Sequence, residues 1–204
     1  LHRTPYGGRN AEYYSEDANL CYMVGSIELP AMERLGILGG IKHFAANDQE
    51  SNREGVSTFY TEQAFREGAL RGFEGAIRKG KVNAVMQAFN RQGVVYSSSC
   101  YELNVTVLRE EWGFKGEAIT DASSGITTGY KSHYTTSMAN GTDIYCLDGE
   151  SVGGGIIAKY IKDNDDGYLL GWLRTAARHT AYALSRSAAV TGLVLVQTAL
   201  CVPI

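Results

Sequence analysis

Residues that can bind polar groups or form covalent bonds follow the ends of apolar runs in this 204-residue sequence. They are Lys42, His43, Asn47, Glu50, Arg53 and Asp121. Parallel α/β folds place their chemistry at the carboxyl ends of strands, so we expect these side chains to converge on one pocket. One chemistry open to such a pocket is Schiff-base catalysis with Lys42 as the amine, as in aldolases. Hydroxyl binding explains a lysine followed by histidine and then Asn-x-x-Glu better.

Each of these residues also has an ordinary structural explanation. Lys42 could be a surface residue at a strand end, and His43 a hydrogen-bonded core histidine. Asp121 could form a turn or cap a helix. Arg53 could be an ordinary salt-bridge partner of Glu50 or Glu54. Only the ordered combination of these residues is specific.

Alternating strands and helices must position these residues. We expect strands at 35–44, 82–89, 117–121 and 142–147, and helices at 61–79, 103–112 and 168–189. In the first helix Phe65, Phe73 and Ile77 share one face. Thr61 is its expected N-cap and Gly80 its C-terminal stop. Strand–helix alternation predicts an α/β fold with a parallel sheet, and the glycines at 153–155 mark a loop.

Composition indicates a globular chain. Hydrophobic residues make up 44% and charged residues 20%, which excludes disorder, collagen and coiled coil. The formal charge of −3, with no basic run, argues against nucleic-acid binding. No apolar stretch reaches the ~18–20 residues of a membrane span. The four cysteines are scattered and form no Cys/His cluster, so we expect neither a metal site nor a disulfide scaffold.

Five sequence blocks, in order over roughly residues 1 to 150, resemble glycoside hydrolase family 3, the β-glucosidase-like group. They are RTPYGGRN (3–10) with EYYSED (12–17), KHFAANDQE (42–50) with NR (52–53), AVMQAFN (84–90), WGFKG (112–116) with ITD (119–121) and, more weakly, ANGTD (139–143). The resemblance implies a TIM-type (β/α)8 barrel. The chain falls short of the ~250 residues of a full barrel. We therefore expect an incomplete barrel, its middle and C-terminal strands, over 1–190, with a C-terminal tail at 191–204.

The resemblance also assigns roles. Asp121 matches the nucleophile of the family. The positions expected to bind substrate in the −1 subsite are Arg9, Lys42, His43, Arg53, Met86 and Phe89. Phe89 stands where many members have tyrosine. Asn47 and Glu50 belong to the same motif, and we expect them to orient Lys42 and Arg53.

The implied activity is that of a retaining, exo-acting β-glycosidase that hydrolyses terminal β-D-glucosyl residues through a covalent glycosyl-enzyme. The substrate would be a β-glucoside or a short β-linked oligosaccharide, with no cofactor, metal, nucleic acid or membrane partner. Such enzymes need two carboxyl groups. Cationic Lys42 and Arg9 are expected to keep the nucleophile ionised.

The sequence departs from the family pattern in two ways. Ala122 follows the nucleophile where many relatives have tryptophan. The family's acid/base usually comes from a separate α/β sandwich domain, and its first barrel strands precede the Arg9 block. We therefore expect another chain or domain to supply the missing strands and the acid/base. Asp48, Glu50 and Glu54 are the nearby carboxylate substitutes.

Alternatives remain open. The chain could be a non-catalytic sugar-binding or structural fragment of such an enzyme, or part of a β-xylosidase of the same family. The subgroup with a His-Asp acid has K-H-F-P-G-H after the strand, whereas this sequence has Ala45, Ala46 and Asn47. We therefore do not expect that subgroup.

Overall fold

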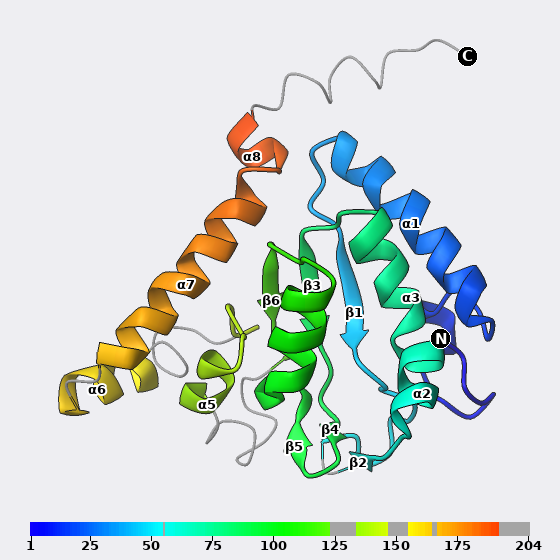
Figure 1. Ribbon diagram of the computed structural model, residues 1–204, viewed down its shortest axis with the longest axis horizontal. Coiled ribbons are helices and arrows are strands. Elements are labelled where there is room, and N and C mark those ends of the chain that lie inside the picture. Colours follow the sequence, from blue (N-terminus) through cyan, green and yellow to red (C-terminus); the bar gives the residue numbers. More distant parts are fainter. Residues whose placement is uncertain (55, 123–133, 147–154, 165–166, 192–204) are drawn as a thin grey trace.

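A parallel sheet forms the centre of the computed structural model, which describes residues 1–54, 56–122, 134–146, 155–164 and 167–191. Its strands are β1 (Gly40–Phe44), β3 (Ala84–Gln87) and β6 (Glu117–Ile119), in that spatial order (Figure 1). Both strand pairs are parallel. The predicted α/β class and parallel sheet are confirmed. All three carboxyl ends therefore meet at one edge.

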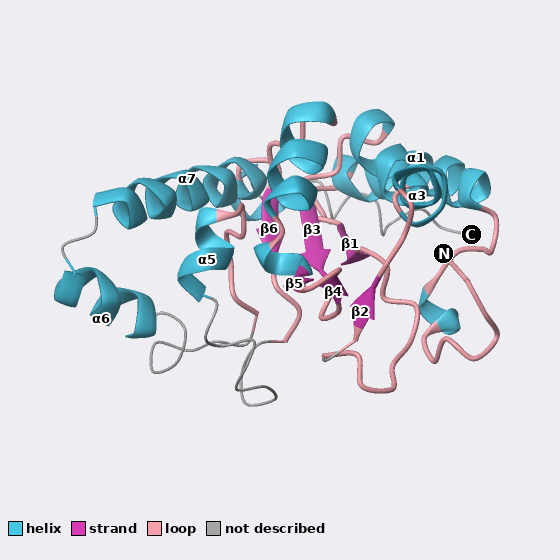
Figure 2. Cartoon of the chain, turned by 60° about the horizontal axis from the view of Figure 1, so that its bottom comes forward, coloured by secondary structure: helices cyan, strands magenta, loops and turns pink. Residues whose placement is uncertain are grey.

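Helices cover one face of this sheet (Figure 2). They are α1 (Ala18–Arg34), a stretch made of α2 (Glu62–Ala64), π-helical Phe65–Ala69, α3 (Arg71–Glu74) and π-helical Gly75–Lys79, a π-helical segment Glu102–Glu111, and α7 (Gly167–Leu184). The core between helices and sheet buries Leu70, Ile77, Val85, Leu108 and Trp112. No helix in the described part of the chain is long and apolar enough to cross a membrane.

The remaining elements are short. They are the 3₁₀ turns Asn10–Glu12 and Ser97–Ser99, the strands β2 (Ser57–Thr58), β4 (Arg91–Gln92) and β5 (Val95–Tyr96), and the helices α5 (Tyr134–Ala139), α6 (Gly155–Asn164) and α8 (Ala188–Thr191).

The helix predicted at 61–79 is confirmed, with two π-helical stretches inside it. The Thr61 hydroxyl accepts a hydrogen bond from the Ala64 N–H, as an N-cap does. The helix ends before Gly80, whose φ of −71° needs no glycine. A side chain there would instead collide with the Ala76 carbonyl oxygen, 2.3 Å from the Cβ position. The helix at 103–112 is confirmed as Glu102–Glu111.

Helix α1 was not predicted, although Asp17 caps it through hydrogen bonds from the N–H groups of Asn19 and Leu20. It packs closely against the stretch 62–79. A Cβ on Gly75 would lie 2.2 Å from the Tyr22 carbonyl oxygen. Glycine at that position allows the two backbones to approach each other.

The strand predicted at 35–44 is confirmed only in its second half, and the first half of the prediction is wrong. Only Gly40–Phe44 forms a strand. Leu35 is the C-cap of α1, and Gly36 follows with a φ of +79° that ends the helix. Leu35 and Ile37 are exposed, so these apolar residues before Gly40 are not part of the sheet.

The strand predicted at 142–147 is reduced to a parallel bridge between Ile144 and Ile119. Position 147 lies outside the described residues. The Asp143 and Ile144 N–H groups both donate to the Ala118 carbonyl. Because two successive donors share one acceptor, the regular hydrogen-bond pattern of a parallel strand does not form here.

The helix predicted at 168–189 is broken after Leu184. The hydroxyls of Ser185 and Ser187 donate back to backbone carbonyls and compete with helical hydrogen bonds. The Ala188 N–H then donates to the Gly36 carbonyl, and α8 begins. Helix α6 begins at Gly155, where we expected a loop. Positions 153 and 154 lie outside the described residues.

A small second sheet adjoins the carboxyl ends of the main strands, and the sequence did not predict it (Figure 1). β4 pairs parallel with β2 and antiparallel with β5. The side-chain amides of Asn90 and Gln92 both donate to the Ala45 carbonyl, at 3.1 and 2.9 Å. The second sheet thereby fixes the loop that follows β1.

Candidate active site

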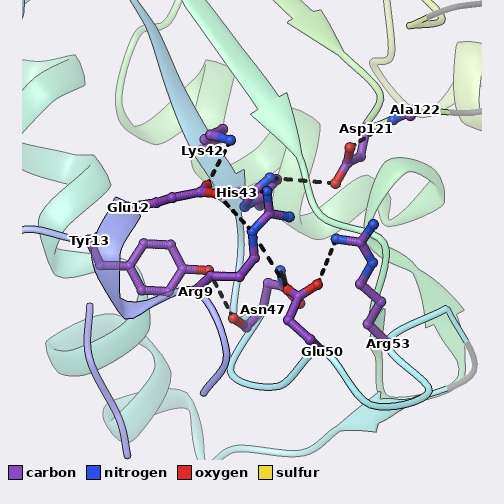
Figure 3. A network of polar contacts seen from close by, with 10 residues as sticks. All are labelled: Arg9, Glu12, Tyr13, Lys42, His43, Asn47, Glu50, Arg53, Asp121 and Ala122. Atoms are coloured by element: carbon purple, nitrogen blue, oxygen red, sulfur yellow. Dashed lines mark hydrogen bonds and ion pairs between the residues drawn. The ribbon is translucent and has the colours of Figure 1, made fainter. Parts of the chain in front are cut away.

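Three of the predicted residues meet at the carboxyl ends of the main strands (Figure 3). Lys42 and His43 lie on β1, and Asp121 follows β6 by two residues. His43 Nε2 is 3.5 Å from Asp121 Oδ2. The peptide bonds Lys42–His43 and Phe44–Ala45 are both cis.

The Asp121 side chain is held by the backbone of the next residue. The Ala122 N–H donates to Asp121 Oδ1 at 2.7 Å. The preceding residue, Thr120, donates its N–H to the Ile144 carbonyl, which fixes the start of the turn. The Asp121 side chain is 12% exposed, and Oδ2 has no hydrogen-bond partner in the described structure. One carboxylate oxygen is therefore anchored, and the other is buried without a hydrogen-bond partner in the described structure.

His43 is a neutral imidazole. Its side chain is almost fully buried, and burial, followed by the positive charges of Arg9 and Lys42, lowers its pKa to about 3. The contact with Asp121 is thus not an ion pair at neutral pH. His43 can accept or donate a hydrogen bond without bringing charge to the site.

We expect His43 to stay neutral down to about pH 4. Its folded pKa lies below its unfolded value, so the unfolded chain binds the extra proton between about pH 6.5 and 3, and folding stability falls as pH falls through that window. Histidine ring signals followed by NMR from pH 8 to 4, with His43→Gln to identify the resonance, would check this. A His43 midpoint near the ordinary value would contradict the burial argument.

An N-terminal segment brings two charged residues against β1. Arg9 Nη2 and Lys42 Nζ lie 3.0 and 2.8 Å from the Glu12 carboxylate. The hydrogen bonds from Lys42 and then Arg9 lower the pKa of Glu12 to about 2. The sequence reasoning did not select Glu12 as a site residue. The available signal was its place in the first block that resembles the family motif, three residues after Arg9.

The loop after β1 holds a second carboxylate among cations. Arg53 Nη1 lies 2.9 Å from Glu50 Oε2, and Arg9 Nε lies 3.8 Å from Glu50 Oε1. The Asn47 side-chain amide donates to Glu50 at 3.0 Å. Tyr13 donates its hydroxyl to the Asn47 carbonyl at 3.1 Å. Glu50 thus contacts Arg53, as expected, whereas the ion pair of Lys42 is with Glu12 and not with the loop.

The two apolar site candidates differ in placement. Phe89 is 1% exposed, and the Arg53 guanidinium lies 4.6 Å from the centre of its ring. Phe89 therefore supports Arg53 and offers no open ring face. Met86 is half-buried on β3, in register with Ile119 of β6. Ala122 packs against the cluster of Phe89 and Tyr96.

Three buried polar atoms near Asp121 have no hydrogen-bond partner in the described part of the molecule. They are His43 Nδ1, Asn47 Oδ1 and Asp121 Oδ2. Buried polar atoms are nearly always paired in folded proteins, so such a group at one site indicates a place for a polar ligand. Neutral and cationic donors around one carboxylate suit a ligand rich in hydroxyl groups.

The same geometry disfavours Schiff-base chemistry. The Lys42 ammonium forms an ion pair with Glu12, whereas a Schiff-base lysine must react as a free amine. Within the described residues there is also no group of three His, Cys, Asp or Glu side chains that could hold a metal ion.

Comparison with known proteins gives a consistent result. The family model described as "Glycosyl hydrolase family 3 N terminal domain" matches residues 1–165. A beta-glucosidase of Ruminococcus albus is 37% identical over 164 residues, which cover 78% of this chain and 17% of that enzyme. Beta-glucosidase B of Emericella nidulans is 40% identical over 121 residues, 59% of this chain and 14% of that enzyme.

A solved structure matches the fold as well. Beta-glucosidase 3B of Thermotoga neapolitana, in complex with alpha-D-glucose, superposes with a TM-score of 0.83 at 32% identity. The match covers 95% of this chain and 27% of that one. The chain thus spans between 14% and 27% of the length of these three proteins.

Proposed function

This chain belongs to glycosyl hydrolase family 3, and from that premise we propose that it carries the nucleophile of a retaining, exo-acting β-glycosidase. The substrate would be a terminal β-D-glucosyl residue of a glucoside or a short β-linked oligosaccharide. The observation that carries the proposal is Asp121, a buried carboxylate with one oxygen anchored and the other unpaired in the described structure.

We further propose that β1, β3, β6 and the bridge at Ile144 are successive strands of a (β/α)8 barrel. Their order in space follows their order in the chain, and helices cover one face, as in that fold. Residues 1–190 would form this part of the barrel and 191–204 a tail. The carboxyl ends of the strands would then be the catalytic end.

In the proposed reaction Asp121 attacks the anomeric carbon while the bond to the leaving oxygen breaks. A second carboxyl group protonates that oxygen. The same group then takes a proton from water, which attacks the glycosyl-enzyme and releases Asp121. The neutral His43 beside Asp121 adds no positive charge that would weaken the nucleophile.

The proposed contacts to sugar hydroxyls come from three elements. Arg9 reaches the site from the N-terminal segment, Lys42 and His43 from β1, and Arg53 from the loop after β1. In the transition state the sugar ring flattens toward an oxocarbenium ion. Hydrogen bonds from these side chains that become stronger in that state would accelerate the reaction. Met86 would line the same subsite.

We propose that the acid/base comes from another domain or chain. A general acid must hold a proton at working pH. Glu12, with a pKa of about 2 and two cationic partners, does not meet this requirement. Glu50 faces Arg53 and Arg9. Asp48 accepts a hydrogen bond from the Tyr60 hydroxyl.

A covalent trap tests the function. With 2,4-dinitrophenyl 2-deoxy-2-fluoro-β-D-glucoside, the fluorine slows both steps while the leaving group needs no protonation, so the glycosyl-enzyme accumulates. We expect the intact protein to gain one fluoroglucosyl mass, on the peptide that contains Asp121. Glycosylation of any other carboxylate would refute Asp121 as the nucleophile. No label, with sugar binding retained, would favour the non-catalytic alternative.

A further inference from the structure

Glu12 occupies a position between two cations of the site (Figure 3). One of its oxygens lies 3.0 Å from Arg9 Nη2, and the other lies 2.8 Å from Lys42 Nζ. A second hydrogen bond reaches it from Arg9 Nε at 3.2 Å. Glu12 thus holds two side chains that arrive from different segments, one N-terminal and one on β1.

The described ion pairs leave Asp121 without a cation in contact. Lys42 pairs with Glu12, and Arg53 pairs with Glu50. The side chain that does approach Asp121 is His43, at 3.5 Å, and it is neutral at working pH. The three cations lie in the same site as the nucleophile, but their described ion pairs are with Glu12 and Glu50.

We propose that Glu12 is a positioning residue that holds Lys42 and Arg9 toward the substrate and away from Asp121. The inference rests on the proposed function of Asp121. Without the Glu12 charge, both cations can turn to the remaining carboxylate of the site. A nucleophile in such an ion pair is less reactive, and the cations no longer face the hydroxyl groups of the sugar.

The electrostatic surroundings set the sign of the expected pH effect. In the described part of the chain, the charged or titratable groups around this site are Arg9, Glu12, Tyr13, Lys42, His43, Asp48, Glu50, Arg53 and Asp121. Loss of the Glu12 charge removes one negative charge from this group and leaves its three cations in place. The site then carries one more unit of net positive charge, which favours ionised carboxylates, so we expect the acid limb of the kcat/KM profile to move to lower pH.

The test is Glu12→Gln in the intact protein, with kcat/KM for an aryl β-glucoside measured from pH 3 to 8. We expect a decrease on the order of 100-fold at the optimum and an acid limb lower by about one pH unit. Glu12→Asp keeps the charge, so we expect its acid limb to stay at the wild-type pH and part of the rate to return.

Glu62→Gln is the matched control, because Glu62 also pairs with an arginine, Arg66, on the helix at 62–79. It is expected to leave rate and profile unchanged. Glu12 is partly exposed, and matching circular dichroism spectra and melting midpoints would establish that the variants fold.

Two outcomes of this test would overturn the proposal. One is a wild-type rate and profile in Glu12→Gln. The other is a lower rate with an unmoved acid limb, which would indicate a structural role only. The fluoroglucoside trap separates this failure from failure of the proposed function, because it reports the nucleophile whether or not Glu12 matters.

Discussion

Replacement of Asp121 by alanine in the intact protein is expected to lower kcat/KM for an aryl β-glucoside by about 10⁴-fold or more. The covalent step needs a carboxylate at the anomeric carbon, and the Asp121 side chain is the one with an unpaired oxygen beside His43. Loss of 10⁴-fold corresponds to about 5.5 kcal/mol of transition-state stabilisation. Steady-state rates with a dinitrophenyl glucoside measure it.

Azide separates a missing nucleophile from a damaged site. Removal of the Asp121 carboxylate leaves space for a small anion, which can form the new bond to the anomeric carbon while dinitrophenolate leaves. We expect azide to restore turnover of the Asp121→Ala variant and to yield the α-glucosyl azide, of inverted configuration. Asp163→Asn removes a carboxylate that pairs with Lys159 on α6 and is the control. A near-wild-type rate in Asp121→Ala would refute the assignment.

The convergence of the site residues could be predicted because it follows from topology. Lys42, His43 and Asp121 were expected at strand ends, and parallel strands place those ends at one edge. β1, β3 and β6 are neighbours in one sheet. The residues that follow them therefore come together even where the predicted strand lengths are wrong. The strand expected at 35–44 was too long, yet its carboxyl end was right.

The missed elements lack a local signal. Helix α1 buries Cys21 and Leu29 but exposes Met23 and Ile27, so its apolar residues mark no single face. The strands β2, β4 and β5 are two residues long, too short for alternation to be read. Hydrogen bonds between residues far apart in the chain, such as that from Gln92 to the Ala45 carbonyl, join the second sheet to the loop after β1.

The partners of the charged side chains could not be predicted either. Lys42 meets Glu12 across a separation of thirty residues, because the N-terminal segment folds back against β1. The motif around Glu50 suggested that this carboxylate orients Lys42, yet its contacts are with Arg53, Arg9 and the Asn47 amide. Sequence spacing identifies which charges a site contains. Only the three-dimensional arrangement identifies how they pair.

Asp143→Ala is expected to lower the free energy of unfolding by about 3–5 kcal/mol, the usual cost of removing one partner from a buried ion pair. Asp143 is 2% exposed in its side chain and contacts three elements. Arg109 Nη2 lies 2.6 Å from its Oδ2, and His179 Nδ1 lies 2.9 Å from its Oδ1. The Ala118 N–H, in β6, donates to Oδ2 at 2.8 Å. The carboxylate therefore ties Glu102–Glu111, β6 and α7 together.

Urea unfolding of Asp143→Ala against the wild type measures the loss, and the double variant Asp143→Leu with Arg109→Met identifies its cause. Truncation of Asp143 alone removes the carboxylate partner of Arg109, whose side chain is only 11% exposed, and leaves that charge buried. The double variant removes both charges. If the unpaired charge dominates, the double variant is more stable than Asp143→Ala. Equal loss in both would instead assign the stabilisation to the hydrogen bonds with Ala118 and His179. Asp163→Asn, which breaks an exposed pair, is expected to change stability by at most about 1 kcal/mol.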